Sequence, residues 1–203
     1  MRVALVGPVY PYRGGIAHYT ALLAQALARH HEVKVISFRR QYPRWLYPGR
    51  TDQDTSRQPM SVAAEYVLDP FFPWTWLRAF RIVTDYRPDI VVFQWWIPFW
   101  APCFGAITRL LRRKGVRTLY ICHNVLPHEP KPWDSTLVKW ALRAPENLVV
   151  HSRDEVQLAG ELLKTESVQF HPLPTYANLL ADMPSRERVR QSLGIQEKRV
   201  LLF

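Results

Sequence analysis

The feature that most constrains the fold is a regular alternation of short apolar runs with helical stretches. Strand-type runs stand at residues 3–7, 33–38, 89–93, 116–122, 147–150 and 168–171. Helical spacing or helix-start signals fill the stretches 16–30, 73–85, 101–114, 135–142 and 152–163. This alternation is typical of a parallel sheet whose two faces are covered by helices. The sequence therefore predicts the α/β class, with a doubly wound and mostly parallel sheet.

The chain length fits one such domain and a short remainder. A chain of 203 residues is long enough to bury a real core. We predict one domain over residues 1–178. Residues 179–203 then supply a linker, a helix and the apolar run 200–203, which reads as the first strand of a further domain. Residues 39–60 show no periodicity and are predicted to be a long excursion.

Composition excludes several classes of protein. With 48% hydrophobic residues the chain is too apolar for a disordered protein. Its two cysteines cannot make a disulfide framework, and the opening MRVALVG lacks the pattern of a signal peptide. We therefore expect a cytoplasmic protein. Residues 90–108 carry no charge over 19 positions, which is the length of a membrane span, but Gln94, Pro98 and Pro102 interrupt them. A strand, a loop and a helix start explain this run better.

Ligands of such sheets bind beyond the carboxyl ends of the strands, so residues 7–15, 94–96, 122–124 and 151–152 are the informative ones. The first of these loops matches neither the G-x-G-x-x-G fingerprint nor the P-loop. It does place Gly14 and Gly15 at a helix start, where bare amides favour an anion, although a plain turn has the same pattern. Arg13 either adds charge to a phosphate site or is simply solvated.

A second candidate is the stretch His123–Glu129, which follows the strand 116–122. Its histidines, His123 and His128, are five residues apart, which is not the spacing of a helical zinc pair, and no metal is expected. A histidine at a strand end is suited to bind a substrate, and a structural histidine is equally compatible with the sequence. There is no Gly-x-Ser-x-Gly nucleophile elbow, which disfavours hydrolases.

Aromatic and basic residues are both abundant, and the formal net charge is +10. This inventory suits the surface of an anionic membrane or a single-stranded nucleic acid, and a core of aromatic residues with a solvated basic face explains it as well. The aromatic residues gather around residues 71–80 and 93–104, and the basic ones around residues 39–50 and 109–117.

Taken in order, these segments resemble the N-terminal half of the retaining glycosyltransferases of family 4. The resemblance covers essentially the whole chain. It is carried by VALVG, by Arg13-Gly-Gly-Ile16 with Tyr19, by Cys122-His-Asn124 with Pro127-His-Glu129, by His151-Ser152, and by His171-Pro172. These enzymes have the GT-B fold, in which two Rossmann-like domains face a cleft.

The resemblance implies transfer of a hexose from a sugar nucleotide to a lipid-linked or glycan acceptor, with retention at the anomeric carbon. It implies that Gly14 and Gly15 approach the donor phosphates and that His123 contacts the donor sugar or its diphosphate as the catalytic candidate. The further binding candidates are Arg13, Asn124, His128, Glu129, Trp95 and Trp96. The sugar nucleotide is expected as co-substrate, with no metal or other cofactor.

One departure from the family pattern matters. Its glutamate pair, E-x7-E, belongs to the donor-binding C-terminal domain, and no two glutamates here have that spacing. We therefore expect the donor half to be missing from this chain and the chain alone not to be a competent enzyme. We also expect contact with the inner membrane and no nucleic-acid partner. The alternative function is a non-enzymatic nucleotide or nucleic-acid binding module.

Overall fold

The computed structural model describes residues 1–43, 51–56, 59–127, 129–174, 184–197 and 199–200. The chain divides into two compact units, residues 1–172 and 173–203. The predicted domain boundary at residue 178 lies outside the described residues and stays a prediction.

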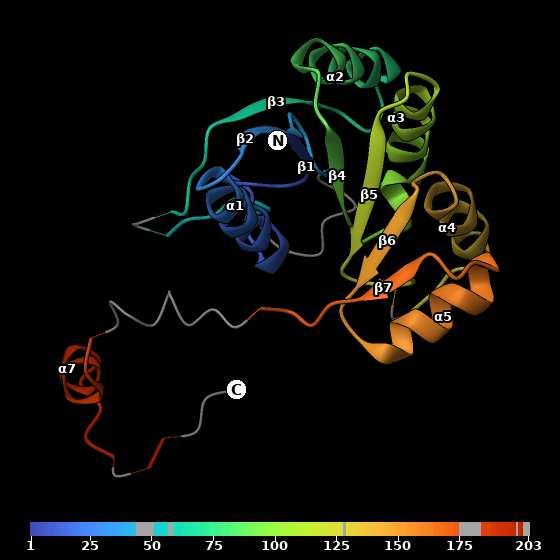
Figure 1. Ribbon diagram of the computed structural model, residues 1–203. Coiled ribbons are helices and arrows are strands. Elements are labelled where there is room, and N and C mark those ends of the chain that lie inside the picture. Colours follow the sequence, from blue (N-terminus) through green and yellow to red (C-terminus); the bar gives the residue numbers. More distant parts are fainter. Residues whose placement is uncertain (44–50, 57–58, 128, 175–183, 198, 201–203) are drawn as a thin grey trace. The chain divides into compact units, whose positions relative to one another are not determined.

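The described part of the first unit is built on one sheet of seven parallel strands (Figure 1). These are β1 (Arg2–Val6), β2 (Glu32–Phe38), β3 (Ala64–Leu68), β4 (Ile90–Trp95), β5 (Arg117–Cys122), β6 (Asn147–Val150) and β7 (Val168–Phe170). Their order across the sheet is β3-β2-β1-β4-β5-β6-β7. The α/β class and the doubly wound parallel sheet are thus confirmed.

Five helices pack on this sheet within the described residues of the first unit. They are α1 (Gly15–Ala28), α2 (Pro73–Tyr86), α3 (Ala101–Arg113), α4 (Asp134–Leu142) and α5 (Arg153–Leu163). Helices α2 to α5 contribute to the larger core cluster, on one face of the sheet. Most of the apolar face of α1 packs in the smaller cluster on the other face (Figure 1). Each helix begins within one residue of its predicted start.

The sequence pattern did not indicate β3. It pairs only with β2, at one edge of the sheet, and the Glu65 carboxylate lies 2.6 Å from the Lys34 ammonium of β2. Because an edge strand is half solvated, its sequence AEYVL lacks the continuous apolar run that marks the central strands. The register with β2 and this ion pair hold it in place.

The larger core cluster is strongly aromatic. Phe93 and Trp95 of β4 pack against Tyr120 of β5, with ring centroids 5.0 and 6.2 Å away, and Phe104 of α3 closes the layer. All four side chains are buried.

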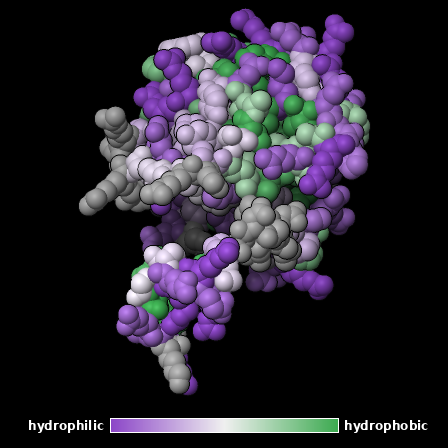
Figure 2. All heavy atoms as spheres, turned by 90° about the vertical axis from the view of Figure 1, so that its left-hand side faces the viewer, coloured by the Kyte–Doolittle hydropathy of each residue, from purple (hydrophilic) through white to green (hydrophobic). Residues whose placement is uncertain are grey.

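The cluster on the α1 face is smaller, and Ile90, Leu119 and Val149 at its margin are only partly buried. Seen from the left of Figure 1, hydrophobic side chains reach the surface among hydrophilic ones (Figure 2).

The uncharged run 90–108 is not one element. It comprises β4, the short 3-10 helix η1 (Pro98–Trp100) and the first half of α3. No helix in the described parts of the chain has the length and apolar character that a membrane crossing requires.

The second unit contains α7 (Arg186–Ser192), where Ser185 caps the helix start by accepting a hydrogen bond from the Arg188 amide at 3.3 Å. The predicted strand 200–203 lies largely outside the described residues.

Candidate functional site

The strand order places a topological switch point between β1 and β4. From β1 the chain runs to β2 on one side, and later returns to β4 on the other side. Ligands of open parallel sheets bind beyond the carboxyl ends of strands at such a point. The residues that end β1, β4, β5 and β6, or follow them, therefore share one edge of the sheet, as predicted.

Gln94 is the side chain that links these strand ends. It is completely buried, and its Oε1 lies 2.8 Å from Nε2 of His123, which follows β5. On the other side it packs against Gly7, which follows β1. A Cβ at Gly7 would stand 2.6 Å from Gln94 Cγ, closer than real Cβ contacts come. Glycine at position 7 therefore makes room for the side chain that orients His123.

His123 is the centre of a small cluster of rings. Its ring centroid is 4.9 Å from that of Tyr19, in α1, and 5.2 Å from that of His151, which follows β6. Burial, reinforced by the charge that His151 can carry, lowers the pKa of His123 to about 4. The imidazole is therefore neutral near pH 7. A neutral imidazole has one donor and one acceptor nitrogen, so it can take either role toward a bound ligand.

Backbone contacts hold the loop that carries His123. The His123 amide donates to the Trp95 carbonyl at 2.8 Å, which extends the pairing of β4 with β5. Two residues on, the Val125 amide donates to the Glu155 carboxylate at 2.7 Å. Glu155 lies in the first turn of α5, where Ser152 accepts a hydrogen bond from its amide at 3.1 Å. The start of α5 thus anchors the loop beside His123.

The start of α1 forms the second part of the site. Gly14 has φ +117°, and no side chain caps the helix there. A Cβ at Gly14 or Gly15 would meet no atom within 4 Å, so the space before the helix is open. The first turn carries no acidic residue. Tyr19, one turn on from Gly15, contacts His123, so the start of α1 lies at the same edge of the sheet. This arrangement suits an anion.

The other predicted site residues that the structure describes differ in how exposed they are. Arg13 is exposed beside the glycines, and its amide donates to the Asp52 carbonyl at 2.8 Å. Asn124 is half-buried next to His123. Glu129 is exposed and lines a groove described below. His128 lies outside the described residues.

Trp95 and Trp96 do not fit the ligand-binding role that was predicted for them. Trp95 is completely buried in the aromatic core, because alternation along β4 turns it away from the face on which Gln94 lies. Trp96 is 9% exposed, and its Nε1 donates to the Tyr42 hydroxyl at 2.5 Å. We assign both tryptophans to the core.

Sequence reasoning did not select Gln94, Tyr19 or His151 as site residues. Gln94 and His151 stand at strand ends that the sequence did single out, but their contacts follow from the sheet register, which aligns Trp95 with Cys122 and Cys122 with Val150. Within the described residues, no group of three histidine, cysteine, aspartate or glutamate side chains could hold a metal ion. The expectation that no metal or further cofactor takes part stays a prediction.

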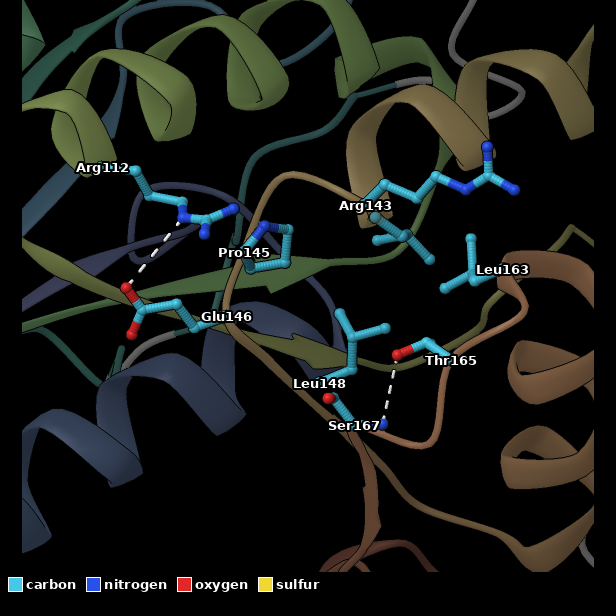
Figure 3. A pocket seen from close by; sticks show the side chains of 9 residues that line it. Arg112, Arg143, Pro145, Glu146, Leu148, Leu163, Thr165 and Ser167 are labelled. Atoms are coloured by element: carbon cyan, nitrogen blue, oxygen red, sulfur yellow. Dashed lines mark hydrogen bonds and ion pairs between the residues drawn. The ribbon is translucent and has the colours of Figure 1, made fainter.

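A cavity of about 290 Å³ lies at the opposite ends of the strands (Figure 3). Its charged lining is largely satisfied within the protein. The Arg112 guanidinium lies 4.0 Å from the Glu146 carboxylate and donates to the Ala144 carbonyl at 3.0 Å. The Ser167 amide donates to the Thr165 hydroxyl at 3.2 Å. This cavity lies away from the switch point, and the site around His123 remains the candidate.

Comparisons with solved structures agree with this fold. Sucrose-phosphate synthase from Thermosynechococcus elongatus matches 96% of the chain with a TM-score of 0.62 and 15% identity. UDP-N-acetylglucosamine 2-epimerase from Rickettsia bellii matches 98% with a TM-score of 0.58 and 10% identity. An alpha-glucosyltransferase in complex with UDP and a 13-mer DNA containing an HMU base matches 86%, with a TM-score of 0.55 and 11% identity.

The matched part is 52%, 49% and 43% of those three chains, so this chain spans about half of their length. Comparison with curated protein sequences found no match. The family model of the glycosyl transferase 4-like domain matches residues 14–175, most of the chain and nearly all of the site. The chain therefore belongs to the glycosyl transferase 4-like domain family.

Proposed function

We propose that this chain forms one wall of the active site of a retaining glycosyltransferase. The reaction is transfer of a hexose from a sugar nucleotide to a lipid-linked or glycan acceptor. The observation that carries the proposal is the neutral His123, oriented by Gln94 and set beside the open start of α1 at the switch point of the sheet.

The start of α1 binds the donor diphosphate. Glycine at positions 14 and 15 leaves the space in front of the first amides open, so a phosphate can approach the backbone closely. Arg13 adds a positive charge nearby. During transfer, negative charge grows on the leaving phosphate, and fixed amides with a helix dipole stabilise it without reorganisation.

His123 binds the donor sugar or its diphosphate through the imidazole nitrogen that Gln94 leaves free. Because its imidazole stays neutral, the free nitrogen donates or accepts one hydrogen bond. The tight contact of Gln94 with Gly7 fixes the imidazole orientation before the donor arrives. Such preorganisation is what makes a hydrogen bond effective in a transition state.

Two facts support a sugar nucleotide as the ligand. The chain belongs to a glycosyl transferase family, and the alpha-glucosyltransferase that shares its fold was determined in complex with UDP. Since the chain spans about half of the length of its structural neighbours, we propose that a second domain supplies the other wall. One wall alone gives weak binding, on the order of millimolar, and turnover well below about 1 per second.

The test is titration of the 203-residue chain with UDP-glucose, GDP-mannose and ADP-glucose, with binding measured by ligand-observed NMR. We expect one donor to bind and the His123→Ala variant to weaken its affinity at least tenfold. The matched control is His30→Ala, which removes an exposed histidine just after α1. Equal affinity of both variants for the donor would remove His123 from the site. Salt-sensitive binding of oligonucleotides without any donor binding would support the alternative nucleic-acid module.

A further inference from the structure

A second concave surface is lined in part by the loops that follow β4 and β5. It is a groove of about 420 Å³, within the size range of small-molecule pockets. We call it the apolar groove. Its wall is formed mainly by Pro70, Ile97, Phe99, Pro127, Trp133 and Leu137.

Some residues that line the apolar groove follow residues of the candidate site closely in the sequence. Ile97 follows Gln94 by three residues, in the loop after β4. Pro127 follows His123 by four residues, in the loop after β5. The two loops that follow Gln94 and His123 in the chain therefore also supply part of the wall of the groove.

The chemistry of the groove suits a hydrocarbon chain better than an oligosaccharide. Its only charged lining residues, in the described part of the chain, are Glu129, Lys131 and Asp134. The Asp134 carboxylate already accepts a hydrogen bond from the Lys131 amide at 2.8 Å. A sugar chain needs many placed donors and acceptors, because each buried hydroxyl without a partner costs free energy. The groove offers few of them.

The rim of the groove adds the features of an amphiphile site. Trp133 is 59% exposed, and the Lys131 ammonium lies 5.7 Å from the centre of its ring. Phe71, which follows the lining residue Pro70 in the chain and is 47% exposed, has its ring centroid 6.2 Å from that of Phe99. Exposed aromatic rings with a cation beside an apolar channel are the surroundings in which a lipid chain and its phosphate are both stabilised.

We propose that the apolar groove binds the hydrocarbon chain of a lipid-linked acceptor, with Lys131 beside the lipid phosphate. This inference rests on the proposed function and narrows it, since it selects the lipid-linked acceptor over the free glycan. Binding of the hydrocarbon chain in the groove removes apolar surface from water, which favours the complex. A soluble isoprenoid phosphate is therefore a sufficient probe.

The experiment measures binding of farnesyl phosphate to the 203-residue chain by isothermal titration calorimetry, below the concentration at which the probe forms micelles. Inorganic phosphate is titrated in parallel. The test variant is Pro102→Glu, which places a charge in the groove at an exposed position in the first turn of α3. The matched control is Leu77→Glu, an apolar residue of α2 that is 48% exposed and does not line the groove.

We expect farnesyl phosphate to bind at least tenfold more tightly than inorganic phosphate. Pro102→Glu should abolish that difference, and Leu77→Glu should leave it intact. Equal affinity for the two probes, or an equal loss in both variants, overturns the proposal.

Titration of the unmodified chain with UDP-glucose, GDP-mannose and ADP-glucose separates the two proposals. Donor binding without farnesyl phosphate binding overturns the groove and leaves the proposed function standing. Farnesyl phosphate binding without any sugar-nucleotide binding supports a lipid site and contradicts the transferase.

Discussion

At the scale of single residues, one hydrogen bond organises the candidate site. Gln94 has no exposed surface, and its Oε1 meets His123 Nε2. The residue beneath it is Gly7, where any side chain would collide with Gln94. The sequence could identify His123 by its position after a strand, but only the side-by-side placement of β4 and β5 pairs it with Gln94.

The buried imidazole makes stability depend on pH. His123 in the unfolded chain has an ordinary pKa of about 6.5, and in the folded chain a pKa of about 4. Between these two pKa values the unfolded chain binds more protons than the folded chain. The free energy of unfolding therefore falls as the pH falls. We expect this group to remove about 2 kcal/mol of stability between pH 7 and pH 5. Urea unfolding at both pH values measures it.

The comparison variant for this prediction is His123→Gln, which should lose less stability over the same pH interval than the wild type. His30→Gln, at an exposed position, should behave as the wild type does. If the free energy of unfolding fell equally in His123→Gln and in the wild type between pH 7 and pH 5, His123 would not be the group that causes the pH dependence.

At the scale of elements, the contact between α3 and α4 depends on a glycine. A Cβ at Gly105 of α3 would stand 2.2 Å from Trp140 Cζ3 of α4 and 2.8 Å from Arg109 Nη1. Arg109 lies over the Trp140 ring, 4.1 Å from its centre, and donates to the Gly105 carbonyl at 2.9 Å. The indole therefore lies directly against the backbone of α3, and the guanidinium covers it.

We expect Gly105→Ala to destabilise the protein by about 1–3 kcal/mol, because the added methyl group forces Trp140 and Arg109 away. The matched control is Gly160→Ala in α5. There the new Cβ would lie 3.7 Å from the Thr165 carbonyl oxygen, an ordinary contact, and alanine should stabilise the helix by about 0.5–1 kcal/mol. Chemical denaturation measures the free energy of unfolding of both variants. If it changed in the same direction in both, the contact of Gly105 with Trp140 would be unimportant for stability.

At the scale of the whole molecule, the chain combines a net charge of +10 with exposed aromatic rings. Trp74 is 64% exposed, Trp133 59% and Trp140 41%. We propose that these residues bring the protein to the inner face of an anionic membrane. Interfacial tryptophan and nearby cations are the usual means of such contact, each cation near the surface contributing about 1 kcal/mol.

The corresponding prediction is flotation of the 203-residue chain with vesicles of phosphatidylcholine and phosphatidylglycerol at low salt, and loss of flotation at high salt. Joint replacement Trp74→Ala and Trp133→Ala should reduce the floated fraction several-fold. Leu193→Ala, at a residue 66% exposed, is the control and should float like the wild type. If the chain stays at the bottom of the gradient with anionic vesicles, the proposed membrane contact is wrong. A solvated basic face is then the remaining explanation of the net charge.

The sequence by itself determined the helices and the strands of the first unit other than β3, and their order along the chain. Central strands such as β4 are buried on both faces, so they are continuous apolar runs, and helices begin at recognisable residues such as Pro73 and Ser152. The strand-end rule then pointed to Gly14, Gly15 and His123. Local pattern suffices for these predictions, because strand burial and helix capping depend on near neighbours in the chain.

Only the tertiary structure decided what those residues contact. The edge strand β3 is half solvated and left no clear pattern. The alternation along β4 sends Gln94 to the site and Trp95 to the core, although both are neighbours in one uncharged run. Such assignments depend on the sheet register and on which face a helix covers. These are properties of residues far apart in the chain, so no local pattern carries them.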